Sequence, residues 1–241
     1  MSIRLHNVTK KVRLGPVRLT YENLNIDIPD GGRVALLGHK DAGLPAIVNL
    51  MCAADAPDVG FVERTQSISW SIPSSSYIAK HLTLAANARF VARLYETDEN
   101  AYCARLQELG QFGDAFNTVV DQCQNEHRSM FCFLAGICLP FDHYVLTNVN
   151  IGKKGDRERT AAMVQELSER ASIVLVGQDV KNAKILCDRA YVFQDGKATY
   201  YDDMEAAGEH FASVDASNVD EDEDDFMGGD SALQDLVNMD F

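Results

Sequence analysis

Residues 34–46 read VALLGHKDAGLPA, and this stretch decides the fold class. The apolar run 34–37 is typical of a strand that is covered on both faces. Gly38 and Gly43 follow it with the spacing of a phosphate-binding loop, G-x-x-x-x-G-K-[ST], which stands between a buried strand and a helix. The stretch therefore predicts an α/β architecture of the nucleotide-binding kind, although two glycines at this spacing also occur by chance.

The residues after Gly43 cannot supply the chemistry of such a loop. Leu44 stands where a lysine would reach the β- and γ-phosphates, and Pro45 stands where a hydroxyl would bind Mg²⁺. Pro45 also lacks the N–H that could bind an anion, but proline is tolerated in the first turn of a helix. Ala46 completes a loop end without a polar side chain, and Asp41 adds a carboxylate that would repel a triphosphate. The loop predicts a nucleotide-binding frame without its ligands.

Length and cysteine content favour a single cytoplasmic domain. The chain has 241 residues, enough for one α/β domain with a full core. Residues 1–6 lead directly into an alternating strand pattern rather than a signal peptide, and no apolar run approaches the ~20 residues that span a bilayer. The six cysteines are scattered, without a C-x-x-C pair, which favours reduced thiols over disulfides or a zinc site.

The acidic charge is concentrated at the end of the sequence. Ten of the 36 acidic residues follow Ala212, where there is no Lys or Arg, and the body up to Ala212 carries a net charge of −4 against −14 for the whole chain. We therefore predict a folded body over 1–212 and an acidic, disordered tail over 213–241. No basic stripe is evident, which disfavours a nucleic-acid partner.

The hydrophobic patterns predict alternating strands and helices. Half-buried strands are expected at 3–12 and 17–28, and a further strand at 61–70. Helical spacing dominates about 79–140, with a core helix at 131–139. Later strands are expected at 144–146, 173–176 and 190–193, and helices at 156–170, 180–187 and 204–211. Asp195-Gly196 is a hairpin turn. This order implies a mostly parallel core sheet, an antiparallel N-terminal layer and a helical subdomain.

The motif order resembles that of the nucleotide-binding subunits of ABC transporters, and more narrowly the ATP-binding proteins of capsular polysaccharide exporters. The resemblance covers about residues 1–211 and rests on these segments: IRLHNVTK at 3–10, IPDGGRVALLGH at 28–39, SISW at 67–70, NARFVARLY at 87–95 and LCDRAYV at 186–192. It implies the ABC nucleotide-binding fold. It also implies an ABC-type homodimer or heterodimer and a membrane subunit as partners, with a peripheral position at the inner membrane.

Several positions depart from the pattern that the resemblance implies. Val12 occupies the place of an aromatic that stacks on adenine, and the signature motif falls on residues 124–127, where Glu126 replaces a neutral residue. Thr147 and Asn148 follow the strand at 144–146, where an Asp-Glu pair would hold Mg²⁺ and polarise water. Gln178 replaces the switch histidine, and residues 153–154 read Lys-Lys in place of a Gly-Asp step.

These departures together predict a pseudo-ATPase with no catalytic residue, no metal and no ATP or Mg²⁺ cofactor. We expect it to act as a regulatory or protein-interaction subunit derived from a polysaccharide-export ATPase. Two alternatives stay open. One is a non-hydrolysing ATP-binding subunit of a capsular polysaccharide exporter that works with an active partner. The other is an ATPase with relocated residues, such as Lys40 in place of the missing lysine.

The end of the tail carries an apolar stripe that suits a docking peptide. Ser231 can cap a short helix, which would place four apolar residues on one face. We predict that this face binds a protein partner through Leu233, Leu236, Val237 and Phe241. A basic groove would be the natural complement. The alternative is a solvated segment that only aids solubility.

Overall fold

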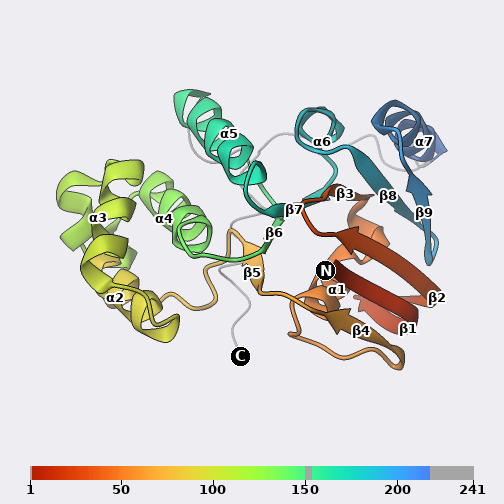
Figure 1. The fold of residues 1–241 in the computed structure, drawn as a ribbon, viewed down its shortest axis with the longest axis horizontal. Coiled ribbons are helices and arrows are strands. Elements are labelled where there is room, and N and C mark those ends of the chain that lie inside the picture. Colours follow the sequence, from red (N-terminus) through yellow and green to blue (C-terminus); the bar gives the residue numbers. More distant parts are fainter. Residues whose placement is uncertain (1, 150–153, 218–241) are drawn as a thin grey trace.

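A six-stranded sheet forms the centre of the computed structural model, which describes residues 2–149 and 154–217 (Figure 1). Its strand order is β5-β6-β7-β3-β8-β9. The bounds are Arg33–Gly38 for β3, Ile68–Ile72 for β5, His143–Leu146 for β6, Ser172–Gly177 for β7, Arg189–Gln194 for β8 and Lys197–Tyr201 for β9. All neighbours pair in parallel except β8 and β9, which form an antiparallel hairpin. The predicted mostly parallel core sheet is therefore confirmed.

A second, antiparallel sheet has the strand order β2-β1-β4, with β1 at Ser2–Leu14, β2 at Val17–Pro29 and β4 at Val59–Arg64. The N-terminal layer is confirmed, but the single strand predicted at 61–70 is wrong. The chain leaves one sheet after β4 and enters the other at β5. Between them, the Ser2 N–H donates to Thr65 Oγ1 at 3.0 Å and the Ser67 N–H donates to Asp142 Oδ2 at 2.9 Å. The break thus depends on partners that are distant in sequence.

Seven α-helices surround the sheets within the described ranges. They are α1 (Leu44–Met51), α2 (Leu84–Leu94), α3 (Glu99–Gly110), α4 (Asn125–Ile137), α5 (Lys154–Ser168), α6 (Val180–Leu186) and α7 (Met204–Ser217). Figure 1 shows α2, α3 and α4 as a group beside the sheets, and α5, α6 and α7 along one face of the parallel sheet. The helical part is confirmed. However, α4 begins six residues before the predicted core helix, and α7 continues to Ser217, beyond the expected end at 211.

Two hydrophobic cores meet at β3. Val34 and Leu36 face the core shared with the antiparallel sheet and α1, whereas Ala35 and Leu37 face the core shared with the other helices. All four side chains are at most 1% exposed. Because both faces of the strand are covered, the unbroken apolar run at 34–37 is explained by its position at the centre of the molecule.

The hairpin turn between β8 and β9 packs closely against β2 of the antiparallel sheet. Asp195 and Gly196 have φ values of 48° and 76°, as expected for the predicted two-residue turn. A Cβ on Gly196 would lie 2.3 Å from the carbonyl oxygen of Thr20 in β2, so only glycine permits this approach.

Two negative findings apply to the described part of the chain. None of its helices is long and apolar enough to cross a membrane. Its cysteines, six in all, are free, as expected, and the residues placed by the structure contain no cluster of side chains suited to a metal ion. Leu233, Leu236, Val237 and Phe241 lie outside the described residues, so the docking face of the tail stays a prediction.

Candidate functional site

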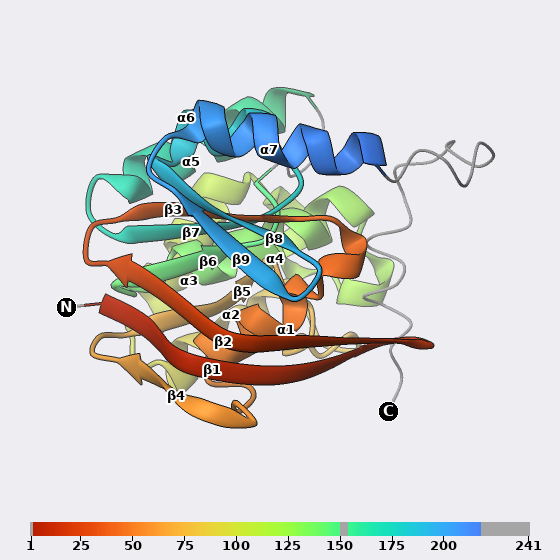
Figure 2. The same cartoon turned by 90° about the vertical axis from the view of Figure 1, so that its right-hand side faces the viewer.

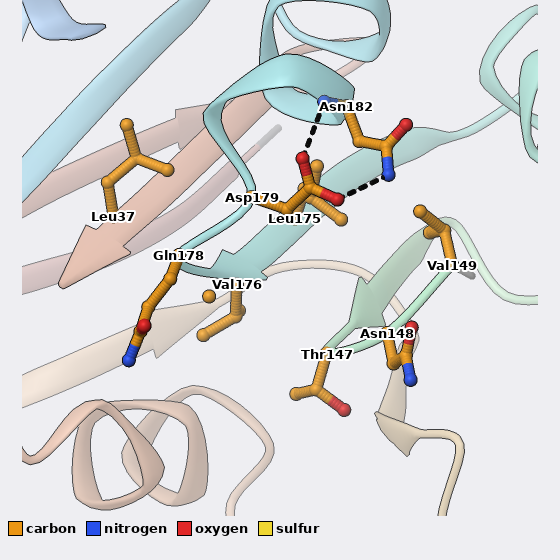
Figure 3. A pocket seen from close by; sticks show the side chains of 10 residues that line it. Leu37, Thr147, Asn148, Val149, Leu175, Val176, Gln178, Asp179 and Asn182 are labelled. Carbon is orange, nitrogen blue, oxygen red and sulfur yellow. Dashed lines mark hydrogen bonds between the residues drawn. The ribbon is translucent and has the colours of Figure 1, made fainter. Parts of the chain in front are cut away.

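The carboxyl edge of the parallel sheet brings together the positions singled out by the sequence. Because β3 lies beside β7 and β7 lies beside β6, the loop after Gly38, the residue Gln178 and the pair Thr147-Asn148 leave the sheet at the same edge. In parallel α/β sheets, this edge is where ligands bind. Figure 3 shows a small hollow there of about 60 Å³, lined by Leu37, Thr147, Asn148 and Gln178 together with Val149, Leu175, Val176, Gly177, Asp179 and Asn182.

The loop between β3 and α1 is filled by its own apolar side chains. Leu44 is 5% exposed and Ala42 is 3% exposed, and both belong to the core under the antiparallel sheet. A Cβ on Gly38 would lie 2.8 Å from Cβ of Ala42 and 3.2 Å from Cδ1 of Leu44. The Leu44 side chain therefore folds back over the first glycine of the loop, where a phosphate loop would need open space.

Some backbone N–H groups of the loop donate hydrogen bonds to carbonyl groups within the loop. Residues Lys40–Ala42 form a short 3₁₀ turn, η1, in which the Ala42 N–H donates to the His39 carbonyl at 3.0 Å. The Ala46 N–H donates to the Gly43 carbonyl at 3.0 Å. Pro45 has no N–H and lies in the first turn of α1, as predicted. Anion-binding loops instead turn such amides toward the ligand.

Three residues that the sequence did not single out as contacts hold the loop in this shape. Val12 lies against it, since its Cγ1 would be 3.0 Å from a Cβ on Gly43. The buried Tyr21 hydroxyl donates to the Ala42 carbonyl, and burial raises the pKa of this phenol well above its ordinary value. The ring of Phe211 in α7 stacks on His39, with ring centroids 4.3 Å apart. In the sequence, the available signal for these contacts was that Tyr21 and Phe211 are aromatic residues.

Two polar residues at the edge of the sheet, Thr147 and Asp179, form hydrogen bonds that stabilise the fold. Thr147 Oγ1 donates to the Ile72 carbonyl at 3.1 Å, which links β6 to β5. Asp179 caps α6 by accepting hydrogen bonds from the Asn182 N–H at 3.0 Å and from Asn182 Nδ2 at 2.6 Å, as Figure 3 shows. Asp179 is the sole carboxylate among the residues lining the hollow, and it serves as a helix cap.

The segment identified with the signature motif lies at the start of α4. Gln124 is the residue before the helix, and Glu126 lies in the first turn. A carboxylate there complements the positive end of the helix dipole. A negative side chain in this turn opposes the binding of an anion at the same helix end. Figure 1 places α4 in the helical part, apart from β3 and α1.

Comparisons with known proteins support the fold and the sequence resemblance. No family model matches the chain. The chain is 28% identical to the ATP-binding protein BexA of Haemophilus influenzae over 211 residues, 87% of this chain and 97% of that protein. It is 28% identical to the polysialic acid transport ATP-binding protein KpsT of Escherichia coli, covering 85% and 93% of the two chains. Identity to the capsule polysaccharide export ATP-binding protein CtrD of Neisseria meningitidis is 25%, covering 82% and 92%.

Solved structures give the same fold at lower sequence identity. The ATP-binding cassette MJ0796, in a dimer bound to ADP and Pi, matches with a TM-score of 0.71 at 16% identity, covering 83% of this chain and 97% of that chain. A putative metal-chelate type ABC transporter matches with a TM-score of 0.70 at 11% identity, covering 85% and 84%. In sequence the chain is thus similar to ATP-binding proteins of capsule polysaccharide exporters, and in fold it is similar to the ATP-binding cassettes of ABC transporters.

Proposed function

We propose that this chain is a catalytically inactive ABC ATPase-like subunit that neither hydrolyses nor holds Mg²⁺-ATP and acts through protein contacts. The observation that carries the proposal is the packing of Leu44 over Gly38, with its side chain 5% exposed. A triphosphate in the loop would have to displace a buried leucine and would gain no lysine in exchange. One charge-assisted hydrogen bond contributes about 1.5–3 kcal/mol, and several are missing together.

The donor set at the sheet edge does not fit a magnesium ion. Mg²⁺ in nucleotide sites is held by one or two carboxylates together with phosphate oxygens and water. Thr147 and Asn148 are neutral, Pro45 has no hydroxyl, and Asp179 is used as the cap of α6. An attacking water likewise finds no base at the end of β6. These residues support loss of both metal binding and hydrolysis.

The test compares the wild-type chain with two variants in the same loop. We expect no shift of the melting temperature with ATP, with or without Mg²⁺, and phosphate release equal to that of Leu44→Asp. Lys40→Ala tests the relocated-lysine alternative, since it should change nothing. Turnover by the wild type above Leu44→Asp, or a Mg²⁺-ATP shift that Lys40→Ala removes, would refute the proposed inactivity.

An exposed apolar surface on the helical part supports a role in protein contacts. Phe90 is 52% exposed and Leu94 is 62% exposed, one turn apart on α2, so their side chains share one face. Tyr95, 40% exposed, continues this surface and lies next to Trp70 and Phe141, with ring centroids 5.5 and 5.4 Å away. Apolar side chains gathered in this way mark contact sites more often than scattered ones do.

We propose that an ABC exporter membrane subunit binds this α2 surface. In detergent-solubilised membranes of the native host, the wild-type chain should retain such a subunit, and Phe90→Ser with Leu94→Ser should reduce its recovery about tenfold, which corresponds to about 1.4 kcal/mol. Ile185→Ser is the matched control, because Ile185 is 71% exposed on α6, away from this surface. Equal recovery by both variants would refute the assignment of the surface.

A further inference from the structure

The tip of the β1–β2 hairpin carries an unusual cluster of cations on its solvent face. Arg13 and Arg18 are direct cross-strand partners in the register, and Lys11 lies opposite Thr20 on the same face. Lys11, Arg13 and Arg18 are all exposed. Like charges placed opposite each other destabilise a strand pair, so such a pair calls for a compensating anion. We call these three residues the basic tip.

The described residues supply no ion pair to the basic tip. Arg13 Nε donates to the carbonyl of Gly15 at 3.4 Å, which is a contact within the turn. Asp58 accepts the main-chain N–H of Lys11 at 2.7 Å rather than pairing with its ammonium group. By contrast, Lys10 on the buried face has its carboxylate, Asp55, at 2.7 Å.

The sequence beyond α7 offers a run of six carboxylates of opposite charge. Residues 220–225 are Asp-Glu-Asp-Glu-Asp-Asp, and they begin three residues after Ser217, where α7 ends. In Figure 2 the C-terminal end of α7, at the top, and the turn of the β1–β2 hairpin, at the bottom, both lie toward the right-hand side of the molecule. At about 3.3 Å per residue, the eight residues from Ser217 to Asp225 reach about 26 Å.

We propose that the acidic segment 220–225 of this chain binds the basic tip of the same chain. Attachment favours this partner over any dissolved anion, because a short tether gives a millimolar effective concentration. The contact would lay the segment over the part of the hairpin whose inner face, through Val12, covers Gly43 of the loop. This contact involves the outer surface of the hairpin and does not depend on whether the loop binds nucleotide.

The experiment uses a carbodiimide that joins a lysine amine to a carboxylate without a spacer, followed by mass spectrometry of the full-length chain. Lys11 should form its main cross-link with residues 220–225, at a yield independent of protein concentration. Because the Debye length falls to about 3 Å in about 1 M salt, the yield should drop about tenfold there. Lys80 and Lys181, exposed on other parts of the surface, serve as internal comparisons.

Variants of the acidic segment and of the basic tip are each compared with a control variant that changes charge elsewhere in the chain. Replacing the six acidic residues at 220–225 by their amides removes the reacting carboxylates and so confirms the identity of the Lys11 cross-link, whereas Asp230→Asn with Asp235→Asn should leave it unchanged. Arg13→Gln with Arg18→Gln should lower the yield at Lys11 about tenfold, and the control Arg89→Gln should not. Circular dichroism confirms that each variant is folded.

Two results would overturn the inference. Cross-links from residues 220–225 spread evenly over Lys11, Lys80 and Lys181 would show that the segment has no preferred site. A Lys11 yield that rises with protein concentration would show that the basic tip takes the segment of a second copy instead. In either case the intramolecular contact is excluded.

Discussion

The packing of Leu44 can be tested by its contribution to stability. Burying a leucine side chain contributes about 1.5–3 kcal/mol, and truncation to alanine adds the cost of the cavity, so Leu→Ala changes in cores cost about 2–5 kcal/mol. Leu44 is 5% exposed, and its side chain lies beside Gly38, which has no side chain to refill the space. We therefore expect Leu44→Ala to lower the free energy of unfolding by about 3 kcal/mol.

Urea denaturation followed by circular dichroism measures this loss, and the melting temperature should fall by about 6–12 °C for a chain of this size. Leu44→Met conserves volume and should cost less than about 1.5 kcal/mol. Asn49→Ala is the matched control, because Asn49 is exposed on the same helix and should stay within about 0.5 kcal/mol. If Leu44→Ala costs no more than Asn49→Ala, Leu44 does not fill the loop and the proposed inactivity loses its main support.

Three further predictions concern stability. Gly43→Ala should cost about 1–2 kcal/mol in urea denaturation, because Gly43 has a φ of 64° and its Cβ would lie 3.0 Å from Val12. Asn87→Ala should cost about 1–3 kcal/mol by the same measurement, since it leaves the Ala79 N–H without its acceptor, whereas the Ala79 and Thr83 carbonyls still accept from the Leu82 and Asn87 N–H groups. Burial lowers the pKa of His143 in the folded chain. The unfolded chain therefore binds the proton first as the pH drops, and the stability of the fold should fall below about pH 6.5. His143→Gln should make the melting temperature less dependent on pH in this range.

Much of the fold could be predicted because its signals are local. The run 34–37 predicted a central strand, and Asp195-Gly196 predicted the turn of the β8–β9 hairpin. The strand break at 65–67 was missed although residues 63–67 are all polar, because no glycine or proline marks it. Its cause, Asp142 accepting from Ser67, lies 75 residues away.

The sequence predicted which edge of the sheet the candidate residues share, but not how side chains pack in the loop. Strand order alone brings Thr147 and Gln178 to the edge beside the loop, which follows from the fold class. The loop is covered by Val12, Tyr21 and Phe211, which come from β1, β2 and α7 and contact Gly43, Ala42 and His39. No pattern within 34–46 shows that these residues cover the loop, because packing of this kind is decided by tertiary contacts.

The burial of Leu44 limits which substitutions could restore ATP binding and hydrolysis. Leu44→Lys with Pro45→Ser would return the two missing side chains of the loop, but it would replace a buried leucine by a cation that must reach solvent along its stem. We expect this variant to be less stable than the wild type and to bind ATP weakly, as a shift in melting temperature would report. It should not release phosphate, because Thr147 and Asn148 still supply neither a metal ligand of the acidic type nor a base. Turnover should require Thr147→Asp and Asn148→Glu in addition. Phosphate release by the double loop variant alone would show that another group supplies the base.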